Sequence, residues 1–445
     1  MINQYLYVSF SKRAPNKLYL DASVRYRCVF PAEYLAQQNI TAHCIHYSQL
    51  KQIQLHDYSR VICHRPRYSR HLKSLLKLCK MHDIEAISDW DDLLFNPSLA
   101  KFSPAYLSGQ LSFKQSKTMA SEYQKALRLF KNVTVSTDKL KEQVLCEHPD
   151  CTVSVIYNQL PARWASPHIF ENETDLIEHR LKNKTIYYFP GTAHHASNFH
   201  HVSRILASYL HQNPSINLNI VGTMSFDQSI FPSKQIRTSP FVMFEDLPNL
   251  IKQAWVSISP LEENIFNECK SGLKFWESGL LGVPVISNHN LDMSRFNNIG
   301  LLQSNDLQDW EAYLDKLQDK DFYTQASAAA YTTSQHAKFS FDNRQAEPLE
   351  RKELQTILTA KIGSDWPLAL LSPTHKKYSQ ANSIINSILK VDTITHLETI
   401  AMASNNKRSY LASTPSNFKK IKKLKNNPKL FLKDMLKNIK QNRSS

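Results

Sequence analysis

Glycine is scarce in this chain, with 8 residues in 445, and neither glycine-rich phosphate motif, GxGxxG or GxxxxGK[ST], occurs. The sequence therefore gives no support to the usual dinucleotide-binding and P-loop classes. No apolar run approaches the roughly 20 residues that a membrane-spanning helix needs. The opening residues, MINQYLYVSFSKRAP, do not place an apolar segment after a charged one, so we expect no signal peptide.

Paired cysteines are also lacking. The seven cysteines are scattered, odd in number and never arranged as CxxC. That usage predicts free thiols in a reducing, cytoplasmic compartment rather than a disulfide framework. The motifs GxSxG and HExxH are absent as well, which removes two common hydrolase patterns.

Short apolar segments alternate with amphipathic segments along most of the chain. This alternation predicts parallel, doubly wound sheets, and the length exceeds what one core normally serves. The strands expected in the first half are residues 5–10, 42–47, 60–65, 84–90, 132–137 and 151–158. Those expected in the second half are residues 184–191, 216–222, 255–261 and 284–288, with helices over 195–213, 245–254 and 267–281.

The predicted fold class is α/β, with two doubly wound, Rossmann-like domains that face each other across a cleft. The predicted divisions are an N-terminal domain over 1–160, a linker over 161–183, a C-terminal domain over 184–345, closing helices and a partly helical extension over 346–416, and a helical basic tail over 417–445. Ligands in such sheets bind at the carboxyl ends of the strands, near helix N-termini.

Six of the eight glycines fall in the predicted C-terminal domain, three of them in the stretch FNECKSGLKFWESGLLGVPVISN at 266–288. If residues 267–281 form one helix, Lys270, Lys274 and Glu277 lie at i, i+4 and i+7 on one face. Two lysines there suit a diphosphate, and a carboxylate suits the vicinal hydroxyls of a ribose. The alternatives are an exposed, ion-paired helix face and glycines that merely end a strand or a helix.

The run PLEENIFNECKSGLKFWESGLLGVPVIS resembles the donor-site segment of GT-B glycosyltransferases, in the family-4-like group of bacterial capsule and O-antigen (lipopolysaccharide) biosynthesis. YYFPGT, INLNIVG and VSVIYNQL are similar to other segments of that group. The resemblance implies the GT-B fold and a nucleotide-sugar donor, with Glu277 on the ribose. Two positions depart from the pattern. Cys269 stands where the family's first glutamate is usual, eight residues before Glu277, and GTAHHASNF replaces a basic pair, so we assign the diphosphate to Lys270 and Lys274. The expected donor contacts are Gly191, Thr192, Gly222, Asn267, Lys270, Ser271, Lys274 and Glu277.

Charged side chains follow two predicted strands of the first domain. His64 and Arg65 come after one strand, and the run ISDWDDLLF places Asp91 and Asp92 after the next. Because both sites lie at the cleft rim, we expect Asp91 or Asp92 to act as a base toward an acceptor hydroxyl. His64 and Arg65 are expected to contact the acceptor or a phosphate. Helix capping by the acids is the alternative.

A histidine-rich run follows the first strand of the second domain. His194, His195, His200 and His201 lack the i, i+4 helix spacing and the accompanying acids or cysteines that a zinc site uses. We expect His194 or His195 to contact phosphate or acceptor and to be further catalytic candidates. GT-B enzymes generally need no DxD-bound metal, so the resemblance implies no metal and no cofactor.

The tail accounts for much of the net charge of +15, because residues 418–445 carry nine lysines and one arginine against Asp434, a net +9. Apolar residues recur there at helical spacing, which predicts basic amphipathic helices on an anionic membrane surface. Nucleic-acid binding and a disordered tail are the alternatives, and we expect no nucleic-acid partner. The lysines expected at the membrane are Lys419, Lys420, Lys422, Lys423, Lys433 and Lys437.

Together these features predict an enzyme, a glycosyltransferase that moves a sugar from a nucleotide-sugar donor to a growing bacterial surface glycan or a lipid-linked acceptor. We expect it in the cytoplasm, peripherally bound to the inner face of the cell membrane. The alternatives are a nucleotide-sugar 2-epimerase, a polyol-phosphate transferase, a non-catalytic scaffold and a basic nucleic-acid-binding protein.

Overall fold

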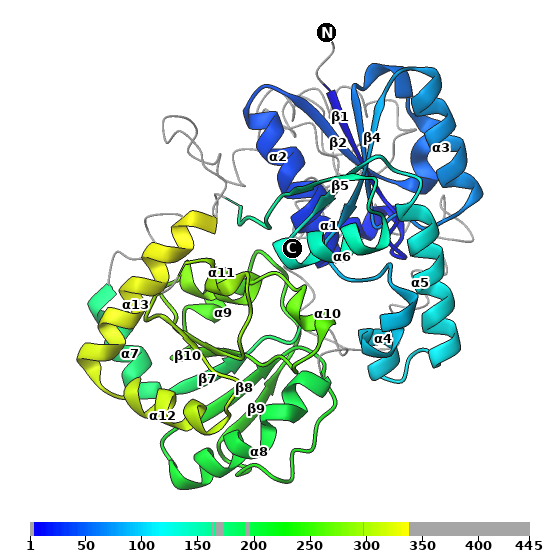
Figure 1. The fold of residues 1–445 in the computed structure, drawn as a ribbon. Coiled ribbons are helices and arrows are strands. Elements are labelled where there is room, and N and C mark those ends of the chain that lie inside the picture. The colour runs from blue at the N-terminus through cyan, green and yellow to red at the C-terminus, as the bar shows by residue number, and fades with distance from the viewer. Residues whose placement is uncertain (1–3, 162–163, 165–172, 192–195, 297, 338–445) are drawn as a thin grey trace, which may run out of the picture.

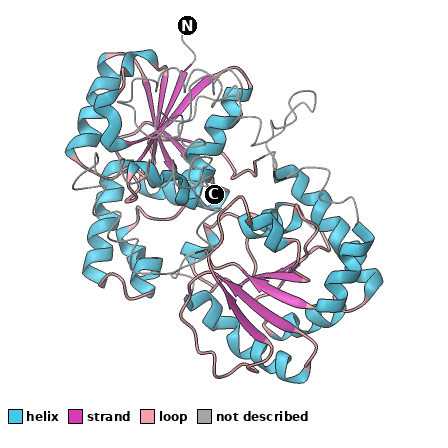
Figure 2. Cartoon of the chain, turned by 180° about the vertical axis from the view of Figure 1, so that it is seen from behind, coloured by secondary structure: helices cyan, strands magenta, loops and turns pink. Residues whose placement is uncertain are grey.

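The computed structural model describes residues 4–161, 164, 173–191, 196–296 and 298–337. These residues form two sheets of six parallel strands each, with helices on their faces (Figure 1). Figure 2 shows the two sheets from behind, one in each domain. The prediction of two doubly wound α/β domains is confirmed.

The first sheet has the strand order β2-β1-β3-β4-β5-β6. Its strands are β1 (Gln4–Ser9), β2 (Thr41–His46), β3 (Arg60–His64), β4 (Glu85–Trp90), β5 (Asn132–Val135) and β6 (Thr152–Val155). Its helices are α1 (Ala22–Val24), α2 (Phe30–Gln37), α3 (Arg70–Met81), α4 (Pro104–Leu107), α5 (Phe113–Leu127) and α6 (Asp138–Glu147). A π-helical turn (Arg25–Val29) joins α1 to α2, so the chain is helical throughout from α1 to α2.

The second sheet has the strand order β12-β11-β10-β7-β8-β9. Its strands are β7 (Thr185–Tyr188), β8 (Asn217–Val221), β9 (Ile236–Ser239), β10 (Val256–Ser259), β11 (Val285–Ser287) and β12 (Leu301–Gln303). The helices are α7 (Glu173–Asn183), α8 (Ala196–Gln212), α9 (Leu247–Ile251), α10 (Ile265–Glu268), α11 (Leu273–Gly279), α12 (Gln308–Lys316) and α13 (Lys320–Ser334). The sequence prediction missed β9 and β12. Both are short edge strands without a fully buried apolar run, so their sequences lack the usual strand signal.

The single helix predicted over 267–281 is wrong, because the chain turns between α10 and α11. Side chains from the loop after β11 form hydrogen bonds with the backbone of this turn. Gly272 N donates to Asp292 Oδ2 at 2.6 Å, and Asn290 Nδ2 donates to Lys270 O at 3.0 Å. A Cβ on Gly272 would lie 2.7 Å from Met293 Cγ and 2.9 Å from Met293 N. The break therefore depends on contacts with a loop about twenty residues further on.

We expect Gly272→Ala to destabilise the protein. The added methyl group meets backbone as well as side chain at Met293, and such overpacking typically costs about 1–3 kcal/mol. In thermal unfolding this corresponds to a fall in melting temperature of roughly 2–10 °C. Gly272→Ser should lower it further, and an unchanged melting temperature for both variants would contradict the close approach.

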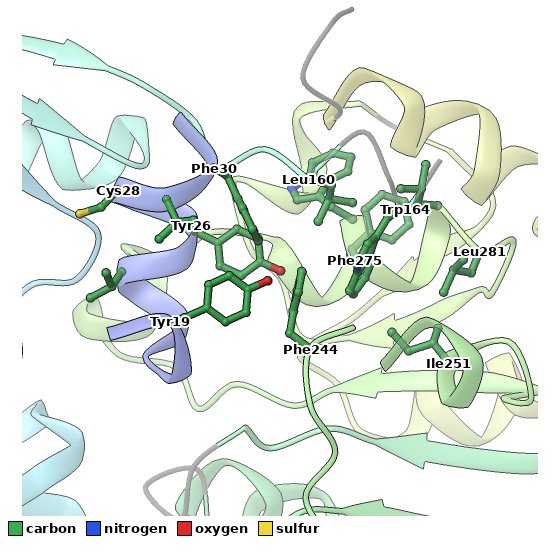
Figure 3. Close-up of a cluster of buried hydrophobic side chains, with 14 of the residues drawn as sticks. Tyr19, Tyr26, Cys28, Phe30, Leu160, Trp164, Phe244, Ile251, Phe275 and Leu281 are labelled. Atoms are coloured by element: carbon green, nitrogen blue, oxygen red, sulfur yellow. The ribbon is translucent and has the colours of Figure 1, made fainter. Parts of the chain in front are cut away.

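One buried apolar cluster joins the two domains (Figure 3). It includes Tyr26 and Phe30 from the first domain, Trp164 from the connecting segment, and Phe244 and Phe275 from the second. The Trp164 and Phe244 rings are stacked with centroids 4.5 Å apart. We call the region where the carboxyl ends of the two sheets meet, including this cluster, the junction. Among the described residues no helix is long and apolar enough to cross a membrane.

Candidate functional site

Lys274 lies in the first turn of α11, and its ammonium nitrogen is buried without a hydrogen-bond partner in the described part of the chain. The nitrogen lies 4.8 Å from the centre of the Tyr188 ring, at the carboxyl end of β7. Burial and the nearby Lys270 lower the pKa of Lys274 to about 7, and Glu277 opposes this only in part. Because a buried cation without a partner is unfavourable, the position favours an anion beside Lys274.

Glu277 lies one turn further along α11 and contacts the first domain. Its Oε1 accepts a hydrogen bond from the Tyr26 hydroxyl. Burial raises the pKa of Glu277, although Tyr26, Arg25 and Lys274 oppose the rise. Tyr26 is itself buried, and its pKa is raised well above the usual range by that burial and by Glu277. The carboxylate that we assigned to ribose hydroxyls is therefore held by a protein hydroxyl in this structure.

Lys270 does not share a helix face with Lys274 and Glu277, because it lies in the turn between α10 and α11. That part of the sequence prediction is wrong. Lys270 Nζ is 3.9 Å from Asp92 Oδ1 in the first domain and 5.1 Å from the centre of the Phe266 ring. It is nevertheless close enough to Lys274 to lower the pKa of that residue. The two lysines therefore reach the junction from different segments of the chain.

Ser271 and Asn267, two other predicted donor contacts, already have protein partners. Ser271 Oγ accepts a hydrogen bond from Asn158 Nδ2 at 2.9 Å, across the junction. Asn267 is buried, and its Nδ2 donates to Asn198 Oδ1 at 3.0 Å and to the carbonyl of Glu262 at 2.9 Å. Asn267 therefore holds the loop after β10 in place.

Gly191 and Gly222 follow β7 and β8 with φ angles of 75° and 119°. Other residues rarely adopt this backbone region, so chain conformation alone accounts for both glycines. Cys269, which replaces the family's glutamate, is a buried thiol whose pKa burial raises to about 12. At neutral pH this thiol is uncharged and cannot take the place of a carboxylate.

Arg65 was predicted to contact an anionic ligand, but it is paired within the first domain. Its guanidinium forms ion pairs with Asp91 and Asp92, and Asp92 is also near Lys270. No helix begins at either aspartate, so the capping alternative is wrong. Burial by itself would raise the pKa of Asp91, but Arg65 and His64 outweigh it and lower that pKa. Asp91 is therefore an ionised carboxylate at neutral pH.

Ser23, which the sequence reading missed, connects His64 to Asp91. Its Oγ lies 2.7 Å from His64 Nε2 and donates to Asp91 Oδ2 at 2.5 Å. His64 Nδ1 is 3.1 Å from Asp89, which also forms a buried ion pair with Arg27. These contacts make a continuous chain, Asp89–His64–Ser23–Asp91, at the carboxyl edge of the first sheet. Because Asp89 and His64 are almost fully buried, only Ser23 and Asp91 in this chain are partly exposed.

One sequence signal points to Ser23. Asp21 caps the helical segment that begins at Ala22, and its side chain accepts a hydrogen bond from Ser23 N at 3.1 Å. An Asp-x-Ser run after the first strand of a doubly wound domain predicts a helix N-terminus at the ligand-binding edge of the sheet. The pairing with His64 and Asp91 depends on long-range contacts and leaves no local pattern.

A cavity of about 380 Å³ lies at the carboxyl ends of β10 and β11. Its lining residues include Glu262, Glu263 and Glu268 together with Asn267 and His289. Carboxylates and amides hydrogen-bond sugar hydroxyls well.

Within the described ranges, no group of three or more His, Cys, Asp and Glu side chains is placed to hold a metal ion. The predicted residues Thr192, His194, His195, Lys419, Lys420, Lys422, Lys423, Lys433 and Lys437 lie outside the described residues.

Solved structures share this two-domain architecture. The sucrose-phosphate synthase of Thermosynechococcus elongatus matches 75% of this chain and 94% of its own length, with a TM-score of 0.54 and 12% identity. The fold is that of the GT-B glycosyltransferases. Anabaena HepE, solved with UDP and glucose, is 13% identical with a TM-score of 0.49 over 75% of this chain and 95% of its own. WaaG, a glycosyltransferase involved in lipopolysaccharide biosynthesis, is 10% identical with a TM-score of 0.48 over 74% of this chain and 95% of its own. No family model and no curated sequence matches this GT-B chain.

Proposed function

We propose that this chain is a glycosyltransferase that takes its sugar from a nucleotide-sugar donor. The observation that carries the proposal is the buried ammonium of Lys274, which has no hydrogen-bond partner in the described structure. A nucleoside diphosphate supplies the missing negative charge. In sugar transfer the diphosphate is also the leaving group, so a cation beside it stabilises charge that develops during the reaction.

The donor roles follow from the surroundings of Lys274. Lys274 binds the diphosphate, with Lys270 close enough to share its charge. Glu277 accepts the ribose hydroxyls once Tyr26 has released it. The acidic cavity after β10 then receives the sugar, because its carboxylates can accept hydrogen bonds from several hydroxyls.

On the acceptor side, Asp91 and Ser23 are partly exposed at the carboxyl edge of the first sheet. The acceptor hydroxyl must lose a proton as its oxygen attacks the sugar. We assign that proton to Asp91, whose carboxylate already accepts the Ser23 hydroxyl, with the His64–Asp89 pair holding Ser23 in position. Asp92 is engaged by Arg65 and Lys270, and we assign it to holding the two domains together.

The acceptor class rests on the sequence alone. The net charge of +9 over residues 418–445 suits an anionic inner-membrane surface. A protein held there peripherally meets lipid-linked glycans, the precursors of capsule and lipopolysaccharide. We therefore propose a growing surface glycan or a lipid-linked sugar as the acceptor.

Nucleotide binding tests the proposal directly. We would measure the melting temperature of the full chain with UDP-, GDP-, CMP- and dTDP-sugars and with the free nucleotides, and then confirm any hit by calorimetry. At about 100 times its dissociation constant, a bound nucleotide adds about 2.7 kcal/mol to stability, which is several degrees. If none of these compounds stabilises or binds the protein, the proposed function is wrong.

The lowered pKa of Lys274 predicts a pH dependence of nucleotide binding. Above the pKa of about 7 the free amine is mostly uncharged, so binding a diphosphate requires uptake of a proton. Affinity should therefore fall about tenfold per pH unit between about pH 7 and pH 9, and stay flat for Lys274→Arg, whose guanidinium keeps its proton. Calorimetric titrations over that range check this result. An affinity that does not change with pH in the unmodified protein would place the diphosphate elsewhere.

A further inference from the structure

Helices α3 and α5 lie along the same side of the first domain (Figure 1). They carry seven basic residues against one acid, Glu122, which gives a net +6. Glu122 is already paired with Arg67. The basic residues are all exposed, and in the described structure none of them is paired with a carboxylate. We call this surface the basic face, and its residues are Arg70, Lys73, Lys77, Lys80, Lys114, Lys117 and Lys125.

The helix pattern explains why these charges gather on one side. In α3 the residues Leu72, Leu75 and Cys79 are buried against the sheet, so Lys73, Lys77 and Lys80 must point outward. In α5 the buried residues include Ser116, Ala120 and Leu127, which leaves the lysines on the opposite side. The basic face is therefore a direct result of how the two helices pack.

Large apolar side chains are exposed on the same helices and on α4, the short helix before α5. They are Leu78, Met81, Tyr106, Leu107 and Phe113, which are between 36% and 65% exposed. The rings of Tyr106 and Phe113 lie edge to face with centroids 5.8 Å apart. Single exposed apolar residues are ordinary, but here three lie on the two helices of the basic face and two on the helix just before α5.

The segment from α4 to the start of α5, which carries Tyr106, Leu107 and Phe113, has no acidic neighbours in sequence. Between Asp92 and Glu122 the chain has lysines but no aspartate or glutamate. Lys101, Lys114 and Lys117 in this stretch are all exposed. Exposed apolar side chains surrounded by lysines are complementary to the surface of an anionic bilayer. The lipid headgroups attract the lysines, and the acyl region accepts the apolar side chains.

We propose that the basic face docks the first domain onto an anionic lipid bilayer. The lysines contact lipid phosphates, and the exposed residues Leu78, Met81, Tyr106, Leu107 and Phe113 enter the headgroup–acyl boundary. A soluble polyanion such as a nucleic acid would pair with the lysines, but the exposed aliphatic side chains would add little to its binding free energy. The apolar residues therefore favour a lipid surface.

The basic face reaches the candidate acceptor side of the molecule. α3 begins just after β3 ends, and the segment that leads through α4 into α5 follows the loop that contains Asp91 and Asp92. One end of the basic face therefore lies at the same edge of the first sheet as Ser23 and Asp91. Docking there brings lipid headgroups toward the junction, although the docking proposal itself does not depend on sugar transfer.

Co-sedimentation of the full chain with vesicles tests the proposal. The vesicles contain phosphatidylcholine with phosphatidylglycerol, and pure phosphatidylcholine serves as the neutral reference. The test variant carries Lys73→Gln, Lys77→Gln, Lys114→Gln and Lys117→Gln. The matched control carries the same charge change at exposed lysines elsewhere, with Lys51→Gln, Lys182→Gln, Lys234→Gln and Lys316→Gln.

We expect the test variant to lose roughly tenfold or more in its partition coefficient for anionic vesicles, because each lysine at the surface contributes severalfold. The control should lose much less. Both proteins keep residues 418–445, so attraction by the tail is common to the two. Equal losses in the test variant and the control would overturn the proposal, since net charge alone would then explain binding.

A second variant separates a bilayer from a polyanion. Leu107→Ser with Phe113→Ser should weaken binding to anionic vesicles severalfold and leave binding to polyphosphate unchanged. Hydrogen exchange should show amide protection in residues 101–117 when vesicles are added, and none in α12. If the double variant binds vesicles as well as the unmodified chain while polyphosphate competes, the surface is a polyanion site and the proposal is wrong. Nucleotide binding, measured on the same proteins, reports separately on the proposed function.

Discussion

Replacing Lys274 with methionine is expected to weaken nucleotide binding about 100-fold or more and, at the same time, to raise the melting temperature. Loss of a desolvated charge opposite a diphosphate typically costs about 2–5 kcal/mol of binding free energy. The gain in stability follows from burial. The pKa of Lys274 is lowered in the folded protein, so its charged form is less favourable there than in the unfolded chain.

The sign of the stability effect can be followed with pH. A lysine whose pKa falls from 10.5 to about 7 on folding destabilises the fold increasingly as pH drops through that interval, and the penalty is fully present below about pH 7. Methionine has a similar shape and no charge, so Lys274→Met removes the penalty. We expect the difference in melting temperature between the two proteins to be several degrees at neutral pH and to shrink toward pH 10.

Calorimetry and thermal unfolding of three proteins check this prediction. Lys234→Met is the control, because Lys234 is an exposed lysine of the same domain. It should change neither nucleotide affinity nor melting temperature. A destabilised Lys274→Met protein would mean that the ammonium has a structural partner. Unchanged nucleotide affinity would mean that the diphosphate does not bind at α11.

Replacing Tyr26 with phenylalanine is expected to tighten nucleotide binding by roughly tenfold. In this structure the Tyr26 hydroxyl donates a hydrogen bond to Glu277, the carboxylate that we assign to the ribose hydroxyls. Without that hydroxyl the half-buried carboxylate lacks its donor, which costs about 1–3 kcal/mol in the ligand-free protein. A bound ribose restores the hydrogen bond, so the ligand recovers part of that cost.

Tyr19→Phe is the matched control for this experiment. Tyr19 makes a similar contact across the junction, but to Glu245 instead of Glu277. It should leave nucleotide affinity nearly unchanged. The gain in Tyr26→Phe should also disappear for 2′,3′-dideoxynucleoside diphosphates, which have no ribose hydroxyls to offer. Equal effects of the two tyrosines, or equal gains for both kinds of nucleotide, would contradict the role assigned to Glu277.

The sequence predicts those elements whose signal lies in the local pattern of apolar and polar residues. The central strands of both sheets are apolar runs between helix-patterned segments, and such runs are visible in a single sequence. The edge strands β9 and β12 were missed because edge positions need no continuous apolar run. The sequence indicates the pair Lys274 and Glu277 as site residues, and the structure places both on α11.

Features that depend on distant contacts were not accessible from the sequence. The break before α11 depends on Asp292, Asn290 and Met293, which belong to a later loop. The Tyr26–Glu277 contact joins residues 251 positions apart. The local pattern favours a continuous helix over 267–281 and a free carboxylate at Glu277. Packing between distant segments instead breaks the helix and pairs Glu277 with Tyr26.

The apolar cluster at the junction has a thermodynamic consequence for ligand binding. Burial of apolar surface on binding normally gives a negative change in heat capacity. If Tyr26 leaves Glu277 through movement of the two domains, the rings of Tyr26 and Phe30 move away from Phe244 and these surfaces become hydrated. Hydration of apolar surface raises the heat capacity. The heat capacity change of nucleotide binding would then be small or positive, whereas a simple rotation of the Tyr26 side chain would leave it negative.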